Sequence, residues 1–221
     1  MLTTAHETGT TPLWAFSPNA DKGVRFLRPQ ERLIFEGDDA DHLYEVLDGV
    51  LRIYKMFLDG RRQVTAFAFA GDVIGFSQGE SFDFDCDALT AARVRAIPRS
   101  GLLRAVRERP EFGEKLLAVA ASEATSARNL SITLGRKSAI ERVASFLCSL
   151  ADRQDGAKGT IALAMTRADI ADYLGLTIET VSRNITKLRA LGLITLQGAS
   201  AVRVDNMPRL RRIAECEDVV N

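Results

Sequence analysis

Apolar and polar residues alternate in short runs between residues 24 and 98, which is the period of a β-strand with one buried face. The runs are VRFL, RLIF, LYEVLDGVLRIYKM, QVTAFAF, DVIGF and ALTAARVRAI. Glycine–aspartate pairs separate many of them, and Asp48-Gly49 and Asp59-Gly60 are strong hairpin-turn signals. Several short strands at this spacing predict a β-barrel or sandwich.

The pattern becomes helical after Pro98. It predicts a short helix over residues 99–107 and, after Pro110, a long helix over residues 111–134 that is rich in Ala, Leu and Val. About 22 helical residues would extend ~33 Å. One stripe of this helix carries small and apolar residues: Leu116, Val119, Ala120, Ala127, Leu130 and Leu134. Since the helix is long and the stripe permits close packing, we expect it to pair with the same helix of a second subunit as a coiled coil; the alternative is that it lies on its own β domain.

Residues 166–194, TRADIADYLGLTIETVSRNITKLRALGLI, predict two short helices joined by a tight turn. Three apolar positions give the first helix a buried face: Ile170, Ala171 and Leu174. Gly175 ends that helix and Thr177 caps the next. Three apolar positions of the second helix again fall at helical spacing: Val181, Ile185 and Leu188. A helix with a packed back and a polar, partly basic front is suited to insertion into the DNA major groove.

The polar front of the second helix supplies candidate base contacts. Arg183 can donate two hydrogen bonds to guanine O6 and N7, Glu179 can accept from an amine such as cytosine N4, and Ser182 can contact thymine. Other polar residues are better placed to bind phosphates, which set the register rather than the sequence. These are Thr166, Arg167, Thr177, Thr180 and Lys187. Glu179 and Arg183 could instead form only an i,i+4 ion pair, although such a pair would also preorganise both side chains.

The remaining C-terminal segments complete a DNA-binding domain around these two helices. They predict an amphipathic helix over 135–151, a loop over 152–159, a small hairpin over 193–206 and a short final helix over 207–217. A hairpin beside two such helices indicates a winged helix-turn-helix. The expected fold is α+β, with an N-terminal arm and β domain over 1–110, a dimerisation helix over 111–135 and a DNA-binding domain over 136–221.

Composition adds modest support for this division. Residues 135–221 contain about 13 Lys and Arg against about 10 Asp and Glu, although the whole chain has a formal net charge of zero. No apolar run approaches the ~20 residues that span a membrane, and no signal peptide is visible, so we expect a cytoplasmic protein.

The cysteines Cys86, Cys148 and Cys216 are too few and too far apart for a disulfide framework. Cys148 falls on the apolar face of a predicted helix, whereas acidic neighbours would raise the pKa of Cys86.

Four strings together resemble the CRP/FNR family of bacterial transcription regulators. They are IFEGDDADHLYEVLDGVLRIYK, GDVIGF, IERVASFL and the helix-turn-helix string quoted above. The resemblance covers about residues 24–215 and implies a β-roll of the cyclic-nucleotide-binding type, a long dimerisation helix and a winged helix-turn-helix.

Within this family the chain is most similar to the FNR/FixK side. Its second helix contains Glu179-Thr-Val-Ser182-Arg183, whereas CRP-type helices carry Gly in place of Ser182 and Arg in place of Ile178. The resemblance implies a homodimer that binds double-stranded DNA at a palindrome similar to TTGAT–N4–ATCAA. It also implies contact with RNA polymerase, for which the Asp59-Gly60 hairpin and the loop over 77–87 are candidates.

The resemblance does not extend to the family's cofactor ligands. CRP-like sites use Gly-Glu for the ribose and Arg-Ser for the cyclic phosphate, whereas Asp72 replaces the glutamate and segment 86–92 contains no Arg-Ser. A buried phosphate without its arginine would lack charge-assisted pairing. An FNR-type [4Fe–4S] cluster needs three thiolates near the N-terminus, and residues 1–23 contain none. The histidines are His6, in the arm, and His42, in an ordinary surface turn, which argues against haem. We therefore expect no cofactor.

These features favour a FixK-like regulator of microoxic, respiratory or nitrogen-fixation genes, controlled by its amount, oxidation or proteolysis. The alternative is a ligand-gated regulator of the same family whose β-roll binds an unknown small effector. Nothing in the sequence supports an enzyme, because it has no phosphate loop of the right spacing and no His–carboxylate metal cluster.

Overall fold

The computed structural model describes residues 23–154, 159–198 and 200–218. The chain forms two compact units. One comprises the chain up to Ile53 together with Phe67–Glu123, and the other comprises Tyr54–Ala66 together with Ala124–Asn221. The hairpin of residues 54–66 therefore belongs to the same unit as the C-terminal helices, although the sequence pattern assigns it to the β domain. The predicted N-terminal arm, including His6, lies outside the described residues.

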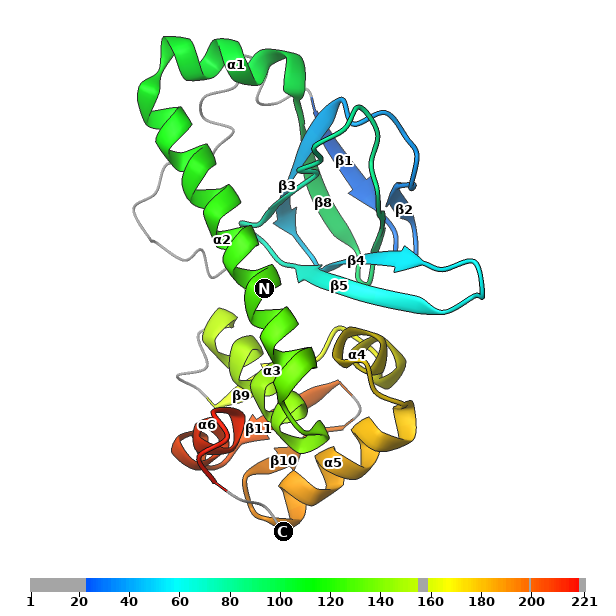
Figure 1. Cartoon of the computed structure of the whole chain (residues 1–221), viewed down its shortest axis with the longest axis vertical. Coiled ribbons are helices and arrows are strands. Elements are labelled where there is room, and N and C mark those ends of the chain that lie inside the picture. The colour runs from blue at the N-terminus through cyan, green and yellow to red at the C-terminus, as the bar shows by residue number, and fades with distance from the viewer. Residues whose placement is uncertain (1–22, 155–158, 199, 219–221) are drawn as a thin grey trace. The chain divides into compact units, whose positions relative to one another are not determined.

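The predicted β region, residues 24–98, forms two four-stranded sheets (Figure 1). The strands are β1 (Val24–Leu27), β2 (Arg32–Ile34), β3 (His42–Asp48), β4 (Leu51–Met56), β5 (Arg62–Ala68), β6 (Val73–Ile74), β7 (Asp85–Ala88) and β8 (Ala92–Pro98). One sheet has the order β1-β8-β3-β6 and the other β2-β7-β4-β5. In the first, antiparallel register places Tyr44 opposite Ala96 and Val46 opposite Val94. The two sheets make the predicted β-roll.

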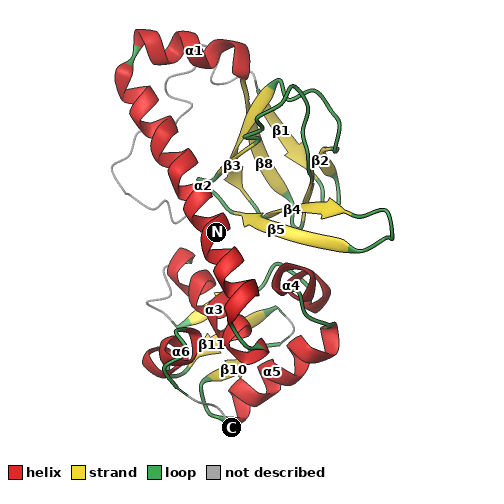
Figure 2. Ribbon diagram, viewed as in Figure 1, coloured by secondary structure: helices red, strands yellow, loops and turns green. Residues whose placement is uncertain are grey.

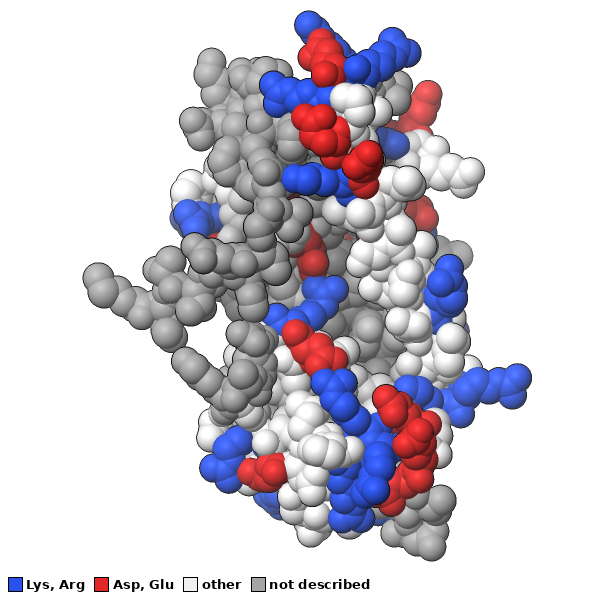
Figure 3. Space-filling model, turned by 90° about the vertical axis from the view of Figure 1, so that its left-hand side faces the viewer, with Lys and Arg blue, Asp and Glu red and all other residues white. Residues whose placement is uncertain are grey.

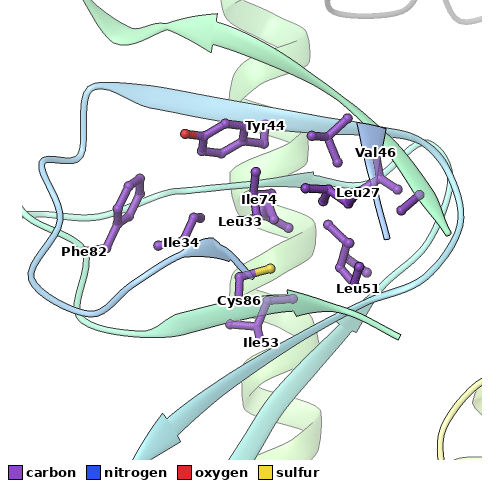
Figure 4. Close-up of a cluster of buried hydrophobic side chains, with 14 of the residues drawn as sticks. Leu27, Leu33, Ile34, Tyr44, Val46, Leu51, Ile53, Ile74, Phe82 and Cys86 are labelled. Carbon is purple, nitrogen blue, oxygen red and sulfur yellow. The ribbon is translucent and has the colours of Figure 1, made fainter. Parts of the chain in front are cut away.

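Alternating apolar residues of both sheets meet in one core. Figure 4 shows the labelled side chains converging between the strands. Leu51, Cys86 and Val94 are fully inaccessible to solvent. The turn before Leu51 requires a glycine: Gly49 has φ +88°, and a Cβ there would lie 2.5 Å from the carbonyl oxygen of Ala91. The hairpin signal at Asp48-Gly49 thus corresponds to a close backbone approach.

The acidic neighbours of Cys86 raise its pKa, as predicted, but they are not the largest cause. Burial is the largest cause of its raised pKa, and the charge of Asp87 adds to it. Asp87 is itself buried and paired with Arg52, and Asp85 with Arg32, so the acidic run carries matched cations. Cys148 is buried, as predicted, and burial raises its pKa to about 11.

Two helices follow the strands as predicted: α1 (Arg99–Glu108) and α2 (Pro110–Arg136). Proline is the first residue of α2, where its missing N–H leaves no helical bond unmade. The start of α2 packs on the β-roll, because Phe112 lies in a buried cluster with Leu43, Val73 and Ile97. The described part of the chain contains no helix long and apolar enough to cross a membrane.

The remaining helices and strands form a winged helix-turn-helix (Figure 2). They are α3 (Ala139–Arg153), β9 (Thr160–Ala162), α4 (Arg167–Leu174), α5 (Ile178–Ala190), β10 (Ile194–Leu196), β11 (Ala201–Val204) and α6 (Met207–Ala214). The small sheet has the order β10-β11-β9. Its β10–β11 pair is the predicted hairpin, and α6 is the predicted final helix.

Two predictions in this region were wrong. The helix predicted over 135–151 begins at Ala139, because Ser138 and Glu141 form a capping box that fixes its start. The predicted loop over 152–159 overlaps the end of α3, and the strand β9 directly after it was missed. A three-residue strand has too little alternation to be recognised from sequence, and β9 exists because β11 pairs with it.

Candidate DNA-binding interface

The second helix of the motif, α5, has the predicted buried and exposed faces. Val181, Ile185 and Leu188 are 0%, 3% and 0% exposed, so they fix the back of the helix in the core. The opposite face leaves three polar side chains exposed: Glu179, Ser182 and Arg183. The helix α5 therefore has one buried face and one polar face open to solvent, which is the arrangement that a DNA recognition helix requires.

The turn before α5 is built as the sequence predicts. Gly175 has φ 60° and ψ 43°, the left-handed conformation that ends α4. The Leu176 N–H donates to the Ala171 carbonyl oxygen at 3.0 Å. Thr177 Oγ1 then accepts from the Thr180 N–H at 3.2 Å, which caps α5. One backbone bond and one side-chain capping bond therefore fix the turn between α4 and α5.

Hydrogen bonds and a nearby positive charge favour the ionised form of Glu179. Hydrogen bonding to its own backbone N–H is the largest cause of its lowered pKa, followed by the Thr177 side chain, and the charge of Arg183 contributes. Arg183 Nη2 donates to Thr180 Oγ1 at 3.3 Å, one turn back along α5. The front of the helix thus carries a fixed anion and a cation within reach of each other.

The predicted phosphate-binding threonines have local structural roles. The Thr166 hydroxyl accepts from the Asp169 N–H at 3.2 Å and contacts its carboxylate at 2.7 Å, which caps α4. The Thr177 and Thr180 hydroxyls lie 3.1 Å apart at the start of α5. These groups stabilise the two helix N-termini, which are themselves positions where phosphates bind in proteins.

The predicted phosphate-binding cations are half-buried. Arg167 begins α4, and burial lowers its pKa. Its Nη1 is the one buried side-chain nitrogen or oxygen without a hydrogen-bond partner among the described residues. Lys187 lies one turn beyond Arg183 on α5. Arg167 and Lys187 therefore lie on the two predicted helices.

The basic residues of α6 are matched by acids. Arg209 pairs with Asp218 at 3.1 Å, and Arg211 pairs with Asp152. Figure 3 likewise shows basic and acidic side chains next to one another on the face it draws. The basic side chains of α6 therefore do not form a positive patch free of acidic neighbours.

Sequence reasoning missed the role of Arg142. Its guanidinium donates to three carbonyl oxygens, those of Leu134 at 2.8 Å, Lys137 at 2.9 Å and Leu174 at 2.9 Å. It therefore ties the end of α2 and the start of α3 to the end of α4. IERVASFL contains this arginine, but no local pattern reveals which distant carbonyls it meets.

The stripe predicted on α2 is divided between two environments. Leu116 and Val119 pack against the apolar cluster of the β-roll. The middle of the helix, residues 121–129, is exposed and includes Ala127, while Ala120, Leu130 and Leu134 are half-buried. The start of α2 thus packs on its own β-roll, as expected if the helix lies on its own β domain. The side chains in the middle of α2 are exposed to solvent in the single chain.

A β-roll joined by a long helix to a winged helix-turn-helix defines a class, the two-domain DNA-binding transcription regulators. Family models support each part: the cyclic nucleotide-binding domain matches residues 24–109, and the Crp-like helix-turn-helix domain matches residues 141–213. The chain is 42% identical over 169 residues to the nitrogen fixation regulation protein FixK of Bradyrhizobium diazoefficiens, covering 75% of this chain and 71% of that protein.

Two further comparisons agree. The transcriptional activatory protein AadR of Rhodopseudomonas palustris is 40% identical, over 76% of this chain and 72% of its own length. The solved structure of FixK2 from Bradyrhizobium japonicum is similar with a TM-score of 0.82 and 38% identity, covering 90% of this chain and 98% of that one. The chain therefore belongs to the CRP/FNR family and is FixK-like, a family of transcription regulators rather than enzymes.

Proposed function

We propose that this chain is a homodimeric transcription activator that binds a TTGAT–N4–ATCAA-like palindrome. Glu179, Ser182 and Arg183 make the base contacts, and Thr166, Arg167, Thr177, Thr180 and Lys187 contact phosphates. The observation that carries the proposal is the exposed polar front of α5 behind which Val181 and Leu188 are buried. An arginine and a glutamate on such a face can distinguish G·C from other base pairs.

Pairing of two chains through α2 would give the required symmetry. The middle of α2 is exposed over residues 121–129 and contains small side chains such as Ala121, Ala124 and Ala127. Small residues let two helices approach closely. In a twofold dimer the two α5 helices would occupy successive turns of the major groove, ~34 Å apart. A palindrome with equal half-sites matches that arrangement.

The side chains present do not fit a cyclic nucleotide. In the segment where the family places its phosphate ligands, Cys86 and Ala88 are 0% exposed and carry no positive charge. Asp72, in place of the ribose-binding glutamate, accepts a hydrogen bond from the Phe69 N–H at 2.9 Å and so holds a turn. The segment contributes no cation, and Arg52, which reaches it, is already paired with Asp87, so the segment offers a cyclic phosphate no charge-assisted partner of its own. We therefore propose that DNA binding requires no cofactor.

The relatives favour a role in oxygen-linked metabolism. Their names include nitrogen fixation regulation protein FixK, electron transport regulator A of Shewanella oneidensis and an anaerobic regulatory protein of Haemophilus influenzae. We propose a cytoplasmic regulator of microoxic, respiratory or nitrogen-fixation genes. The Asp59-Gly60 turn and the loop over 77–87 are the proposed contacts with RNA polymerase, and Leu58 beside that turn is fully exposed.

One feature favours the ligand-gated alternative. An open hollow on the β-roll is lined by apolar residues such as Phe26 and by both cations and acids: Arg28, Arg93, Glu31 and Asp48. A small compound with an apolar part and polar groups of either charge would match these side chains. A thermal-shift screen of such compounds tests this alternative, since a specific rise in melting temperature would favour gating over constitutive binding.

Fluorescence anisotropy tests the main proposal. Purified full-length protein, without added nucleotide, is titrated onto the palindrome and onto a scrambled duplex of equal length and composition. We expect affinity for the palindrome to exceed that for scrambled DNA by about 1000-fold, the lower end for specific regulators. Equal affinity for both duplexes would refute the proposed function.

A further inference from the structure

The end of α4 is held by side chains from outside the helix-turn-helix. The last carbonyl groups of a helix have no partner within it. Here the Leu174 oxygen accepts from Arg142 Nη1 of α3 at 2.9 Å. The Asp172 and Tyr173 oxygens accept from Gln63 Nε2 of β5, at 2.7 Å and 3.4 Å. The C-terminal end of α4, which precedes the turn to α5, therefore accepts hydrogen bonds from both α3 and the β4–β5 hairpin.

Arg62, next to Gln63 on the same hairpin, reaches both ends of α4. Its Nε donates to Asp172 Oδ2 at 2.8 Å, and its Nη2 donates to Asp169 Oδ1 at 2.8 Å. Asp169 is 2% exposed and is the capping residue bonded to Thr166 at the start of α4. Charge-assisted bonds of a half-buried guanidinium are stronger and more directional than those of neutral groups.

Tyr54 helps to fix the guanidinium. The Arg62 carbon Cζ lies 5.6 Å from the centre of the Tyr54 ring, within the range of a cation–π contact. Tyr54 and Arg62 both belong to the segment Tyr54–Ala66, which forms one compact unit with the C-terminal helices. The hairpin thus carries an arginine held by an aromatic ring and two carboxylates, beside a glutamine that caps the same helix.

We propose that Arg62 and Gln63 are positioning residues for DNA recognition. They fix α4, and only Gly175, Leu176 and Thr177 separate α4 from the recognition helix α5. Hydrogen bonds to base edges weaken steeply when the donor is displaced or tilted, so a small movement of α4 would impair base contacts first. Phosphate contacts tolerate such a movement better, because the attraction between charges depends less on direction. This inference rests on the proposed function of α5.

The test compares three single variants of the full-length protein. Arg62→Ala and Gln63→Ala remove the contacts to α4. Arg61→Ala is the matched control: Arg61 is the neighbouring residue of the hairpin, its side chain is 80% exposed, and it pairs with Asp59 at 2.7 Å. The Arg61→Ala variant removes the same positive charge as Arg62→Ala but leaves the contacts with α4 intact. Anisotropy with the palindrome and the scrambled duplex is measured well below each variant's melting temperature.

We expect Arg62→Ala and Gln63→Ala to weaken palindrome binding about tenfold, while binding to scrambled DNA changes by less than about twofold. Arg61→Ala should match the wild type. Arg62→Lys, which keeps the charge but not the forked geometry, should fall between the wild type and Arg62→Ala. Hydrogen exchange should become faster in residues 170–177 of the two variants and remain unchanged in residues 143–150 of α3.

Unchanged palindrome affinity in Arg62→Ala and Gln63→Ala would overturn the inference, even if their melting temperatures fell, because the contacts would then serve stability alone. Equal losses on both duplexes, or the same loss in Arg61→Ala, would also overturn it. If the wild type itself showed no preference for the palindrome, the proposed function of α5 would fail instead.

Discussion

At the scale of single residues, the front of α5 carries the side chains proposed to recognise DNA bases. Arg183 supplies a planar donor fork and Glu179 an ionised acceptor, whose pKa is lowered by local hydrogen bonds. Both side chains are exposed, so DNA can approach them without any change in the core. Their spacing of one helical turn lets them contact neighbouring base pairs.

Arg183→Ala should remove most of the sequence preference. Loss of a bidentate contact costs ~1–3 kcal/mol of discrimination, which is about 5- to 150-fold in the affinity ratio. Competition binding with the palindrome and scrambled DNA measures this ratio. Arg189→Ala, an exposed arginine at the far end of α5, is the control for lost charge. A preference retained in Arg183→Ala would exclude its role as a base contact.

The capping residue Glu141 predicts how stability depends on pH. The Ser138 N–H donates to its carboxylate at 2.8 Å, and this bond is the largest cause of its lowered pKa. Because the folded pKa lies below the ordinary value of 4.5, its contribution is present above that pH and is lost as pH falls through the folded pKa. Glu141→Gln should therefore flatten the fall of melting temperature below about pH 4.5.

Calorimetry between pH 3 and pH 7 measures this effect. Glu114→Gln, at an exposed position of α2, serves as the control and should retain the wild-type slope. Identical acid profiles for the wild type and Glu141→Gln would show that the capping bond does not contribute to the acid dependence.

At the scale of elements, α2 serves two purposes along its length. Its start is anchored to the β-roll through Phe112, Leu116 and Val119. Its middle is exposed over residues 121–129 and is the proposed dimer contact. The stripe of apolar positions is continuous in the sequence, but only part of it is free for a second chain.

Ala127→Glu should convert the dimer to a monomer. A carboxylate at this exposed position would face its twofold mate across closely packed helices, where like charges repel and water is excluded. Asn129→Glu adds the same charge about 200° around the helix and should leave the dimer intact. Sedimentation velocity at micromolar concentration distinguishes the two. A wild-type monomer under these conditions would contradict the proposed pairing.

At the scale of the whole molecule, the chain combines a β-roll of the cyclic-nucleotide-binding type with a Crp-like helix-turn-helix. The segment where the resemblance places the phosphate ligands, residues 86–92, contains no arginine, and its buried Asp87 is paired with Arg52. The family fold is thus retained, and the proposal of cofactor-free DNA binding depends on the side chains of this segment.

Binding of the full-length protein to the palindrome should be independent of cyclic AMP and strongly dependent on salt. Each phosphate that is neutralised adds a slope of about −0.9 to log K against log salt. Anisotropy with and without cyclic AMP over a range of potassium chloride concentrations measures both effects. A strict requirement for the nucleotide would refute the cofactor-free proposal.

The sequence by itself determined the order of all the helices and most of the strands, and also the exposed polar face of α5. Period-2 and period-3.6 patterns are local, and so are the glycine and threonine signals at Gly175 and Thr177, which the structure confirms. The start of α3 is encoded locally, by the capping box of Ser138 and Glu141, but the predicted helix boundary did not use that signal. The strand β9 and the division of the α2 stripe depend on distant partners, and the local pattern did not specify them. The same holds for Arg62, Gln63 and Arg142, whose contacts join residues far apart in the chain. Only the tertiary structure brings a β-hairpin to the helix next to the recognition turn, because side-chain hydrogen bonds depend on distance in space and not on position in the sequence.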